Sequence, residues 1–232
     1  MKPKRPTNVP LYSDICLSAL NQQGLSSKIS LGGTFGPMHY LEYRLTYDID
    51  AWWQPSATGE EQRQVIALLE NTLHPHGEVR VRTWGDVVSI ELKAENRKVF
   101  TFQIAHRSAQ LEPSIPSPWY DIPLDSLPDL VANKMTALVE RGAPRDFLDI
   151  YHLCQAGLFT PEQCWQLWRQ RQQLAESDTS AVRANMALAT HLARIEQHRP
   201  LAAIVDPAAK ESAQSLRTWF KTEFTNVLTR LD

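Results

Sequence analysis

The sequence is poor in cysteine and lacks a long apolar run. Its 232 residues include three cysteines and no Cys-x-x-Cys pair, so neither a disulfide framework nor a zinc site of that spacing is supported. Cys16 and Cys154 lie among apolar neighbours and are expected to be reduced core residues. No segment approaches the roughly 18 apolar residues of a membrane span, and no apolar segment follows the basic N-terminus. These absences predict a cytoplasmic protein without a membrane partner.

Other functional signatures are missing too. The seven histidines show no metal-ligand spacing, and His74-Pro75-His76 is typical of a turn. No serine or cysteine lies in a Gly-x-Ser-x-Gly elbow, so a hydrolase triad has no support. The formal charge of −2 provides no global attraction for nucleic acid, and any contact with RNA must use a local patch.

Apolar periodicity divides the chain into two parts and predicts an α+β fold. The predicted strands are 28–31, 46–53, 78–84, 87–93 and 99–105. The predicted helices are 11–25, 34–41, 59–73, 127–141, 144–156, 161–174, 180–197 and 208–231. Four prolines within residues 112–123 mark a boundary. We therefore expect a mixed β-sheet core in residues 1–111 and a mostly helical C-terminal part in residues 124–232.

One stretch in the N-terminal half joins a glycine turn to a pair of acids. An apolar run ends in Gly32-Gly33-Thr34, and a second β-like run carries Asp48 and Asp50. Alternation along a strand would place both carboxylates on one face, about 7 Å apart, where they repel each other unless a cation lies between them. Such hard oxygen ligands favour Mg²⁺, and backbone N–H groups at adjacent glycines can approach a phosphate. The stretch therefore predicts phosphoryl or nucleotidyl transfer.

Each half of this pattern has a structural explanation when taken alone. A Gly-Gly-Thr sequence is usually a turn, and Asp-x-Asp on a strand is usually a solvated edge. The order of an apolar run, Gly-Gly-Thr, a connection of about a dozen residues and Asp-apolar-Asp resembles the signature of the polymerase-β-like nucleotidyltransferases. Thr34 and Asp48 frame the connection here, which is at the long end of that family's range.

A second group of polar residues lies in the helical part. Lys134 falls within the apolar stripe of the helix predicted at 127–141, so it either extends to the surface or is held inward by an anion. Arg145, Asp146 and Asp149 follow at the start of the next helix. The two acids are three residues apart, and both could be first-turn acids favoured by the helix dipole.

Together with the first motif, residues 133–151 resemble the C-terminal signature of the AbiEii/AbiGii abortive-infection toxins, a branch of the nucleotidyltransferases. In that family a lysine, an arginine–aspartate pair and a further aspartate follow the Gly-Gly-Ser/Thr and Asp-x-Asp motifs. The resemblance covers roughly residues 28–158 and implies a mixed-sheet core with a helical part that closes over the nucleotide.

The resemblance also implies an activity. A nucleoside monophosphate would pass from an NTP to an acceptor such as the 3′ end of tRNA, with two Mg²⁺ ions as cofactors and pyrophosphate released. Most members of the family are toxins encoded beside an antitoxin, so a cognate antitoxin protein is an expected partner.

The site residues follow from the same resemblance, position by position. The expected nucleotide-binding residues are Gly32, Gly33, Thr34, Lys134 and Arg145. The expected catalytic residues are Asp48, Asp50, Lys134 and Asp146, of which the first two would also hold the metal ions. Lys134 would neutralise phosphate charge, and Asp146 would orient it or the acceptor. Catalysis would then rest on positioning and on charge stabilisation of an in-line displacement.

The third metal ligand departs from the family pattern. The family places a carboxylate on a later strand, and the corresponding residue here is Gln103, whose neutral amide is a weaker Mg²⁺ ligand and a poor base. Glu91 on the preceding strand could replace it if the register allowed. We expect Glu91 to face away and Gln103 to occupy the third-ligand position.

Two further functions stay open. The missing carboxylate favours, as an alternative, a catalytically degenerate nucleotide-binding protein that acts through a protein or RNA partner. A third interpretation keeps the enzyme and changes the acceptor to a small molecule or a protein side chain.

Overall fold

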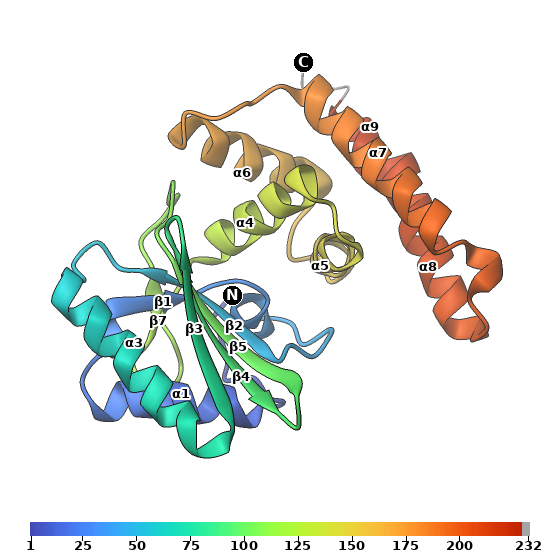
Figure 1. The fold of residues 1–232 in the computed structure, drawn as a ribbon. Helices are drawn as coiled ribbons and strands as arrows, with labels where there is room; N and C mark the ends of the chain where they lie inside the picture. The colour runs from blue at the N-terminus through green and yellow to red at the C-terminus, as the bar shows by residue number, and fades with distance from the viewer. Residues whose placement is uncertain (229–232) are drawn as a thin grey trace. The chain divides into compact units, whose positions relative to one another are not determined.

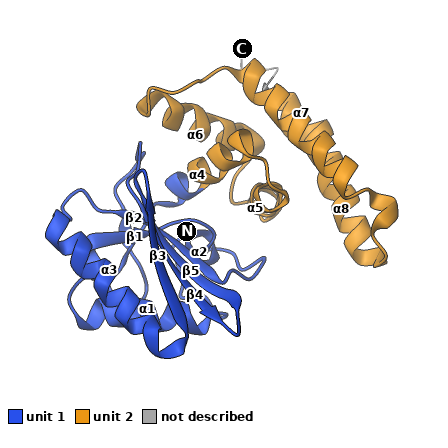
Figure 2. Ribbon diagram, in the orientation of Figure 1, with its two compact units in different colours: residues 1–130 blue, residues 131–232 orange. Residues whose placement is uncertain are grey.

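The structure, a computed structural model, describes residues 1–228 of the chain and has an α+β fold (Figure 1). The chain divides into two compact units, residues 1–130 and residues 131–232 (Figure 2). Within the described residues, unit 1 holds a mixed sheet of seven strands and unit 2 is helical. The fold class predicted from the sequence is confirmed.

Unit 1 is built around the sheet, whose strand order is β3-β4-β5-β2-β1-β7-β6. The strands are β1 (Ile29–Leu31), β2 (Asp48–Trp53), β3 (Glu78–Trp84), β4 (Val87–Ala94), β5 (Arg97–Ala105), β6 (Ile115–Pro116) and β7 (Pro123–Leu124). The helices of this unit are α1 (Leu11–Gln22), α2 (Phe35–Met38) and α3 (Gly59–Leu73). At the centre of the sheet, β2 runs antiparallel to β1 and parallel to β5.

The core of unit 1 lies on one face of this sheet. In β2 the residues Ile49, Ala51 and Trp53 are buried while their neighbours are half-buried, as the period of two along a strand requires. Helices α1 and α3 cover this face with their apolar stripes, and all of these side chains belong to one hydrophobic cluster. The opposite face of β2 is therefore the one that can carry polar side chains.

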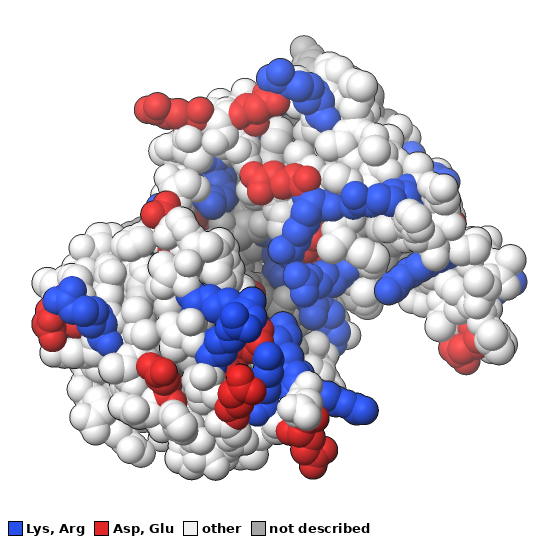
Figure 3. All heavy atoms as spheres, in the orientation of Figure 1, with Lys and Arg blue, Asp and Glu red and all other residues white. Residues whose placement is uncertain are grey.

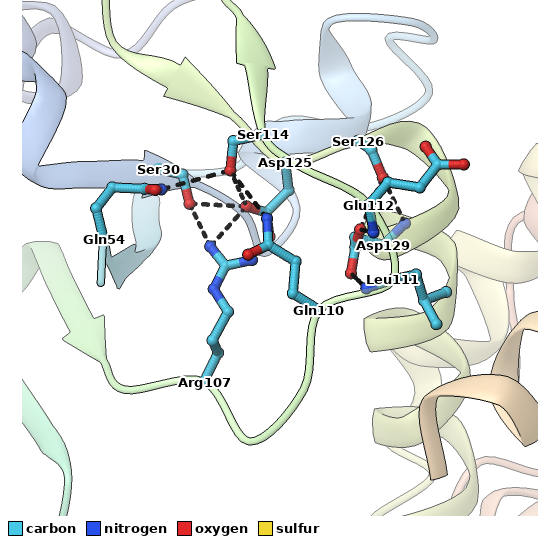
Figure 4. A network of polar contacts seen from close by, with 10 residues as sticks. All are labelled: Ser30, Gln54, Arg107, Gln110, Leu111, Glu112, Ser114, Asp125, Ser126 and Asp129. Atoms are coloured by element: carbon cyan, nitrogen blue, oxygen red, sulfur yellow. Dashed lines mark hydrogen bonds and ion pairs between the residues drawn. The ribbon is translucent and has the colours of Figure 1, made fainter. Parts of the chain in front are cut away.

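A polar network ties the proline-rich segment to β1 (Figure 4). Arg107 Nη2 lies 2.9 Å from Oδ1 of Asp125, and the hydroxyl of Ser30 donates to the same oxygen over 2.7 Å. Burial raises the pKa of Asp125, although the charge of Arg107 and the hydrogen bond from Ser30 oppose that shift. The carboxylate of Asp129 accepts the backbone N–H groups of residues 111 and 112. These contacts hold β6 and β7, two-residue strands that the sequence pattern does not reveal.

Unit 2 packs its helices around a second hydrophobic cluster. The helices are α4 (Leu127–Glu140), which begins in unit 1, α5 (Pro144–Gln155), α6 (Pro161–Leu174), α7 (Ala181–His198), α8 (Pro207–Trp219) and α9 (Thr225–Leu228). A short 3₁₀ turn, η3 (Leu201–Ala203), joins α7 to α8. Within the described residues, no helix is long and apolar enough to cross a membrane.

The last predicted helix, 208–231, is not continuous. A π-helical segment, η4 (Phe220–Phe224), separates α8 from α9, and residues 229–231 lie outside the described part of the chain. Trp219, Phe220 and Phe224, at and within this segment, are all buried in the second hydrophobic cluster. The expectation of one unbroken helix is therefore wrong.

Candidate functional site

The two acids of the Asp-x-Asp motif share one face of the sheet. Asp48 and Asp50 alternate along β2 with the buried Ile49 and Ala51, so both point to the face opposite the core. Trp52 continues the same face, whereas Trp53 is part of the core and is not available to stack on a base.

The glycine turn packs directly against this face. The N–H of Gly32 donates to the carbonyl of Asp50 over 2.9 Å, which extends the pairing of β1 with β2 by one residue. Gly33 has a φ of +55°, and a Cβ atom there would lie 2.0 Å from Oδ2 of Asp50. A Cβ atom on Gly32 would lie 2.5 Å from Nε1 of Trp52. Only glycine fits at either position, and the fit brings the turn against the Asp50 carboxylate.

Thr34 lies at the end of this turn and is held by an arginine. Its hydroxyl accepts a hydrogen bond from Nη2 of Arg44 over 2.6 Å, and Thr34 is 7% exposed. The helix predicted at 34–41 is only the single turn α2 (Phe35–Met38), and the Thr34 side chain makes no cap hydrogen bond. Arg44 was missed by sequence reasoning, although an arginine four residues before Asp48 in the connection between the two motifs was the available signal.

Gln103 occupies the position next to Asp50. The two residues are register partners on the parallel strands β5 and β2, about 4.8 Å apart between strands. Ser89 on β4 is the register partner of Gln103 on its other side. Gln103 therefore lies beside Asp50 on the polar face, and its role as a third metal ligand stays a prediction.

The expectation that Glu91 faces away is wrong. Glu91 on β4 pairs with Thr101 on β5, and Thr101 pairs with Asp48 on β2, so all three side chains share the polar face. Glu91 also lies between Ile90 and Leu92, which are both buried in the core, so alternation along β4 places it on the opposite face. Glu91 is two strands from Asp48, about 10 Å, and its carboxylate lies 3.9 Å from Nζ of Lys93.

These oxygen atoms suit a hard cation. Two carboxylates and one amide oxygen on adjacent strands match the ligands that Mg²⁺ takes, with water and substrate phosphate completing its coordination. No cluster of three His, Cys, Asp or Glu residues able to hold a metal exists among residues 1–228, and the position beside Asp50 on β5 belongs to Gln103. The residues fit a magnesium ion that is shared with a phosphate ligand, and they do not form an all-protein cage.

In unit 2, Lys134 is buried and paired with an acid. Its Nζ lies 2.5 Å from Oδ2 of Asp149, and the two side chains are 8% and 0% exposed. The pair links α4 to α5 within the hydrophobic cluster, so Lys134 does not extend to the surface. Sequence reasoning assigned Asp149 no role beyond that of a first-turn acid favoured by the helix dipole. With about 3.6 residues per turn, Asp146 and Asp149 lie on neighbouring faces of α5, and their spacing does not show which of them meets Lys134.

Asp146 has different partners. It accepts two hydrogen bonds from Arg141, both of 2.9 Å, and a third of 3.0 Å from the backbone N–H of Ala143. This arrangement fixes the turn between α4 and α5 and leaves Asp146 fully buried. Arg145 next to it is exposed and forms no ion pair with another described residue. Arg145 is the member of this motif with a guanidinium open to an anionic ligand.

The polar face of the sheet continues onto its edge strand. Arg80, Arg82 and Trp84 alternate along β3 with the half-buried Val79 and Val81, and all three are exposed. Neither arginine forms an ion pair with another residue in the described part of the chain. In Figure 3, Lys and Arg side chains gather over β3–β5 with acidic side chains among them. Arg82 stands in the same row as Asp50, three strands away, or about 14 Å.

Comparisons with known proteins give one family and a common fold. The family model described as "Nucleotidyl transferase AbiEii toxin, Type IV TA system" matches residues 17–221. The crystal structure of JHP933 from Helicobacter pylori is similar, with 14% identity, a TM-score of 0.52, and coverage of 94% of this chain and 91% of that one. A second H. pylori structure, described as a "putative nucleotidyltransferase", has 14% identity, a TM-score of 0.54 and 95% coverage of both chains. No curated protein sequence matches significantly.

Proposed function

The chain belongs to the AbiEii family of nucleotidyl transferase toxins of type IV toxin–antitoxin systems, and from this membership we propose that it is a Mg²⁺-dependent enzyme acting on RNA. It transfers a nucleoside monophosphate from an NTP to a terminal hydroxyl of RNA, with the 3′ end of tRNA as the first acceptor to test. The hydroxyl loses its proton to solvent as its oxygen forms a bond to the α-phosphorus, and the bond from this phosphorus to the bridging oxygen of pyrophosphate breaks. A cognate antitoxin is its expected protein partner.

One observation carries the proposal: the glycine turn lies against the acid that would hold the metal. Gly33 leaves no room for a side chain between its own backbone and the Asp50 carboxylate. A triphosphate bound by the backbone of this turn would therefore lie within reach of Asp48 and Asp50. Arg44 holds the Thr34 hydroxyl, which limits the freedom of the turn before nucleotide arrives.

The proposed transfer requires magnesium. Asp48, Asp50 and the amide oxygen of Gln103 would hold it, and when bound it would neutralise charge on the phosphates and on the leaving pyrophosphate. The protein's own contribution is to fix these oxygen atoms in one row on a rigid sheet. Because phosphoryl transfer depends mostly on positioning and electrostatics, the amide at position 103 would weaken this site without removing it.

The residues of unit 2 are assigned roles by their chemistry. We assign to Lys134 the neutralisation of phosphate charge, and its ion pair with Asp149 fixes the position of the buried amine group. Asp146 acts indirectly, because Arg141 and Ala143 already use its oxygen atoms. The exposed guanidinium of Arg145 is available for a phosphate.

The polar face of β3 supports a polynucleotide acceptor over a small molecule. Guanidinium groups at Arg80 and Arg82 suit successive phosphates of a strand, and the exposed ring of Trp84 suits stacking on a base. Charged side chains also protect edge strands from pairing with other chains. That structural role requires charge of either sign, whereas RNA binding requires positive charge.

Gln103 specifically favours a second candidate function. A nucleotide-binding protein that has lost transfer would keep the glycine turn and both aspartates and lack the third carboxylate, which is the combination present here. Such a protein would act by binding RNA or a protein partner.

One experiment separates these functions. The pure protein is incubated with each α-³²P-labelled NTP, Mg²⁺ and total RNA, and the products are divided into RNA, protein and small-molecule fractions. The proposal requires label in RNA, and label in protein or in a small molecule would instead identify another acceptor. Nucleotide binding without any transfer would support the degenerate protein.

A matched pair of charge changes tests the acceptor surface. Arg80→Glu with Arg82→Glu should lower the affinity for a single-stranded RNA oligonucleotide by tenfold or more, while Arg80→Lys with Arg82→Lys should keep most of it. If the glutamate and lysine variants bind RNA alike, β3 is only a protected edge.

A further inference from the structure

Unit 2 contains an apolar cavity that the proposed transfer reaction does not use. It has a volume of about 600 Å³ and lies among α5, α7, the η3 turn and α8. Its apolar walls include Phe147, Leu148, Leu192, Ile195, Ile204 and Leu216. This size and lining are typical of sites for small molecules.

A buried cationic side chain lines this cavity. Arg217 on α8 is 7% exposed, and its Nη2 donates a hydrogen bond to the carbonyl of Arg199 over 2.6 Å. No carboxylate pairs with Arg217 among residues 1–228. A buried guanidinium normally has an anionic partner, because removing its charge from water is costly without one.

The ionisable side chains of the lining are all basic. His198 and Arg199, at the end of α7, line the cavity with Arg217, and Ser212 is the remaining polar side chain. No Asp or Glu lines it among the described residues. The cavity therefore has two guanidinium groups in its lining, one buried and one exposed, and no acidic side chain in that lining to pair with them.

We propose that this cavity binds a small amphipathic anion, a molecule with one carboxylate, sulfonate or phosphate head and an aliphatic or aromatic body. The head pairs with Arg217 and the body fills the space between α5, α7 and α8. Phe147 and Leu148 lie on the same helix as Asp146 and Asp149, so the bound molecule contacts the helix that carries those acids. The cavity lies within unit 2 and shares no residue with the glycine turn or the Asp-x-Asp motif.

The simpler account gives Arg217 a structural role alone. In that account its hydrogen bond to Arg199 secures the connection between α7 and α8, and the cavity is an apolar gap that takes any oily molecule. The two accounts differ in one measurable property, which is whether the negative charge of the ligand matters.

Calorimetric titration of the full chain with octanoate and with 1-octanol measures that property. The two probes share a chain length and differ in charge. We expect octanoate to bind about tenfold more tightly than octanol, since a charge-assisted hydrogen bond is stronger than a neutral one. Arg217→Gln should lower octanoate affinity about tenfold and leave octanol affinity unchanged. Lys210→Gln, at an exposed position of the same helix, is the matched control and should change neither.

A filled cavity provides a test that does not depend on Arg217. Ala213 lines the cavity, and Ala213→Phe should abolish binding of both probes while the far-ultraviolet circular dichroism stays unchanged. Equal affinity for octanoate and octanol, no binding of either, or full binding by Ala213→Phe would each overturn the proposal. These measurements use binding alone, so their outcome does not depend on whether the protein transfers nucleotides.

Discussion

Substituting Gly33 by alanine tests the contact on which the candidate site depends. The new Cβ atom would lie 2.0 Å from Oδ2 of Asp50 and 2.5 Å from its Cβ atom, at a residue whose φ is +55°. Gly24 is a matched control in the same unit, because its φ is +67° and a Cβ atom there would meet nothing within 4 Å. The two substitutions share the conformational strain and differ in the clash.

The magnitude follows from these two contributions. The left-handed conformation costs a residue with a side chain about 1–2 kcal/mol, and this is all that Gly24→Ala should lose. Forcing an atom into occupied space adds about 1–3 kcal/mol for Gly33→Ala. For a chain of this length each kcal/mol lowers the Tm by about 2–4 °C, so Gly33→Ala should melt roughly 2–12 °C below Gly24→Ala.

Thermal unfolding of Gly33→Ala and Gly24→Ala, each in the native and in the Asp50→Gly background, completes the test. In an Asp50→Gly background the atoms that meet the new methyl group are absent, and the additional cost of Gly33→Ala should disappear. Nucleotide affinity should fall for Gly33→Ala and stay unchanged for Gly24→Ala. If the two alanine variants melt together, or if the Asp50→Gly background changes nothing, the glycine turn does not pack against this acid and the argument for the site fails.

Three further predictions concern the charges of the site. Asp48→Ala with Asp50→Ala should abolish transfer and leave the Tm unchanged or raised, because repulsion between the carboxylates is relieved; a large fall in Tm would make the acids structural. Gln103→Asp should raise Mg²⁺ affinity and the transfer rate, since a charged oxygen replaces an amide oxygen, and loss of activity in a folded variant would refute our account of that residue. Lys134→Met should abolish transfer and cost about 3–5 kcal/mol in the free energy of unfolding, because it leaves Asp149 buried without a partner. Adding Asp149→Leu should recover most of the stability and none of the activity, and a stable Lys134→Met single variant would contradict the burial of this pair.

Local patterns in the sequence were sufficient for the first motif. Alternation within one strand places Asp48 and Asp50 on one face whatever the rest of the sheet does, and glycine was the residue required at position 33. Features that depend on the pairing of distant segments were not accessible in this way. Alternation within β4 puts Glu91 opposite the buried Ile90 and Leu92, but its place two strands from Asp48 depends on the order in which β4, β5 and β2 pair, which local spacing does not give.

In the helical motif too, local spacing was informative and the contacts between helices were not predictable from it. The apolar stripe of α4 indicated that Lys134 was in an unusual position, and the structure buries it. Its partner depends on how α4 and α5 pack, which the spacing of Asp146 and Asp149 along one helix does not determine. Arg44 contacts Thr34 through a connection without regular structure, and such connections carry no periodic signal from which a contact can be predicted.

The central claim is that this chain transfers the α-phosphate of an NTP by means of Asp48 and Asp50. Parallel incubations with α-³²P-ATP and γ-³²P-ATP, repeated with each of the other NTPs, measure this directly in the presence of Mg²⁺ and RNA. Our account predicts α-label in RNA, no γ-label in any acceptor, and loss of the signal with EDTA or in the Asp50→Asn variant. Transfer of γ-label, or α-label transfer that persists in Asp50→Asn, would contradict it.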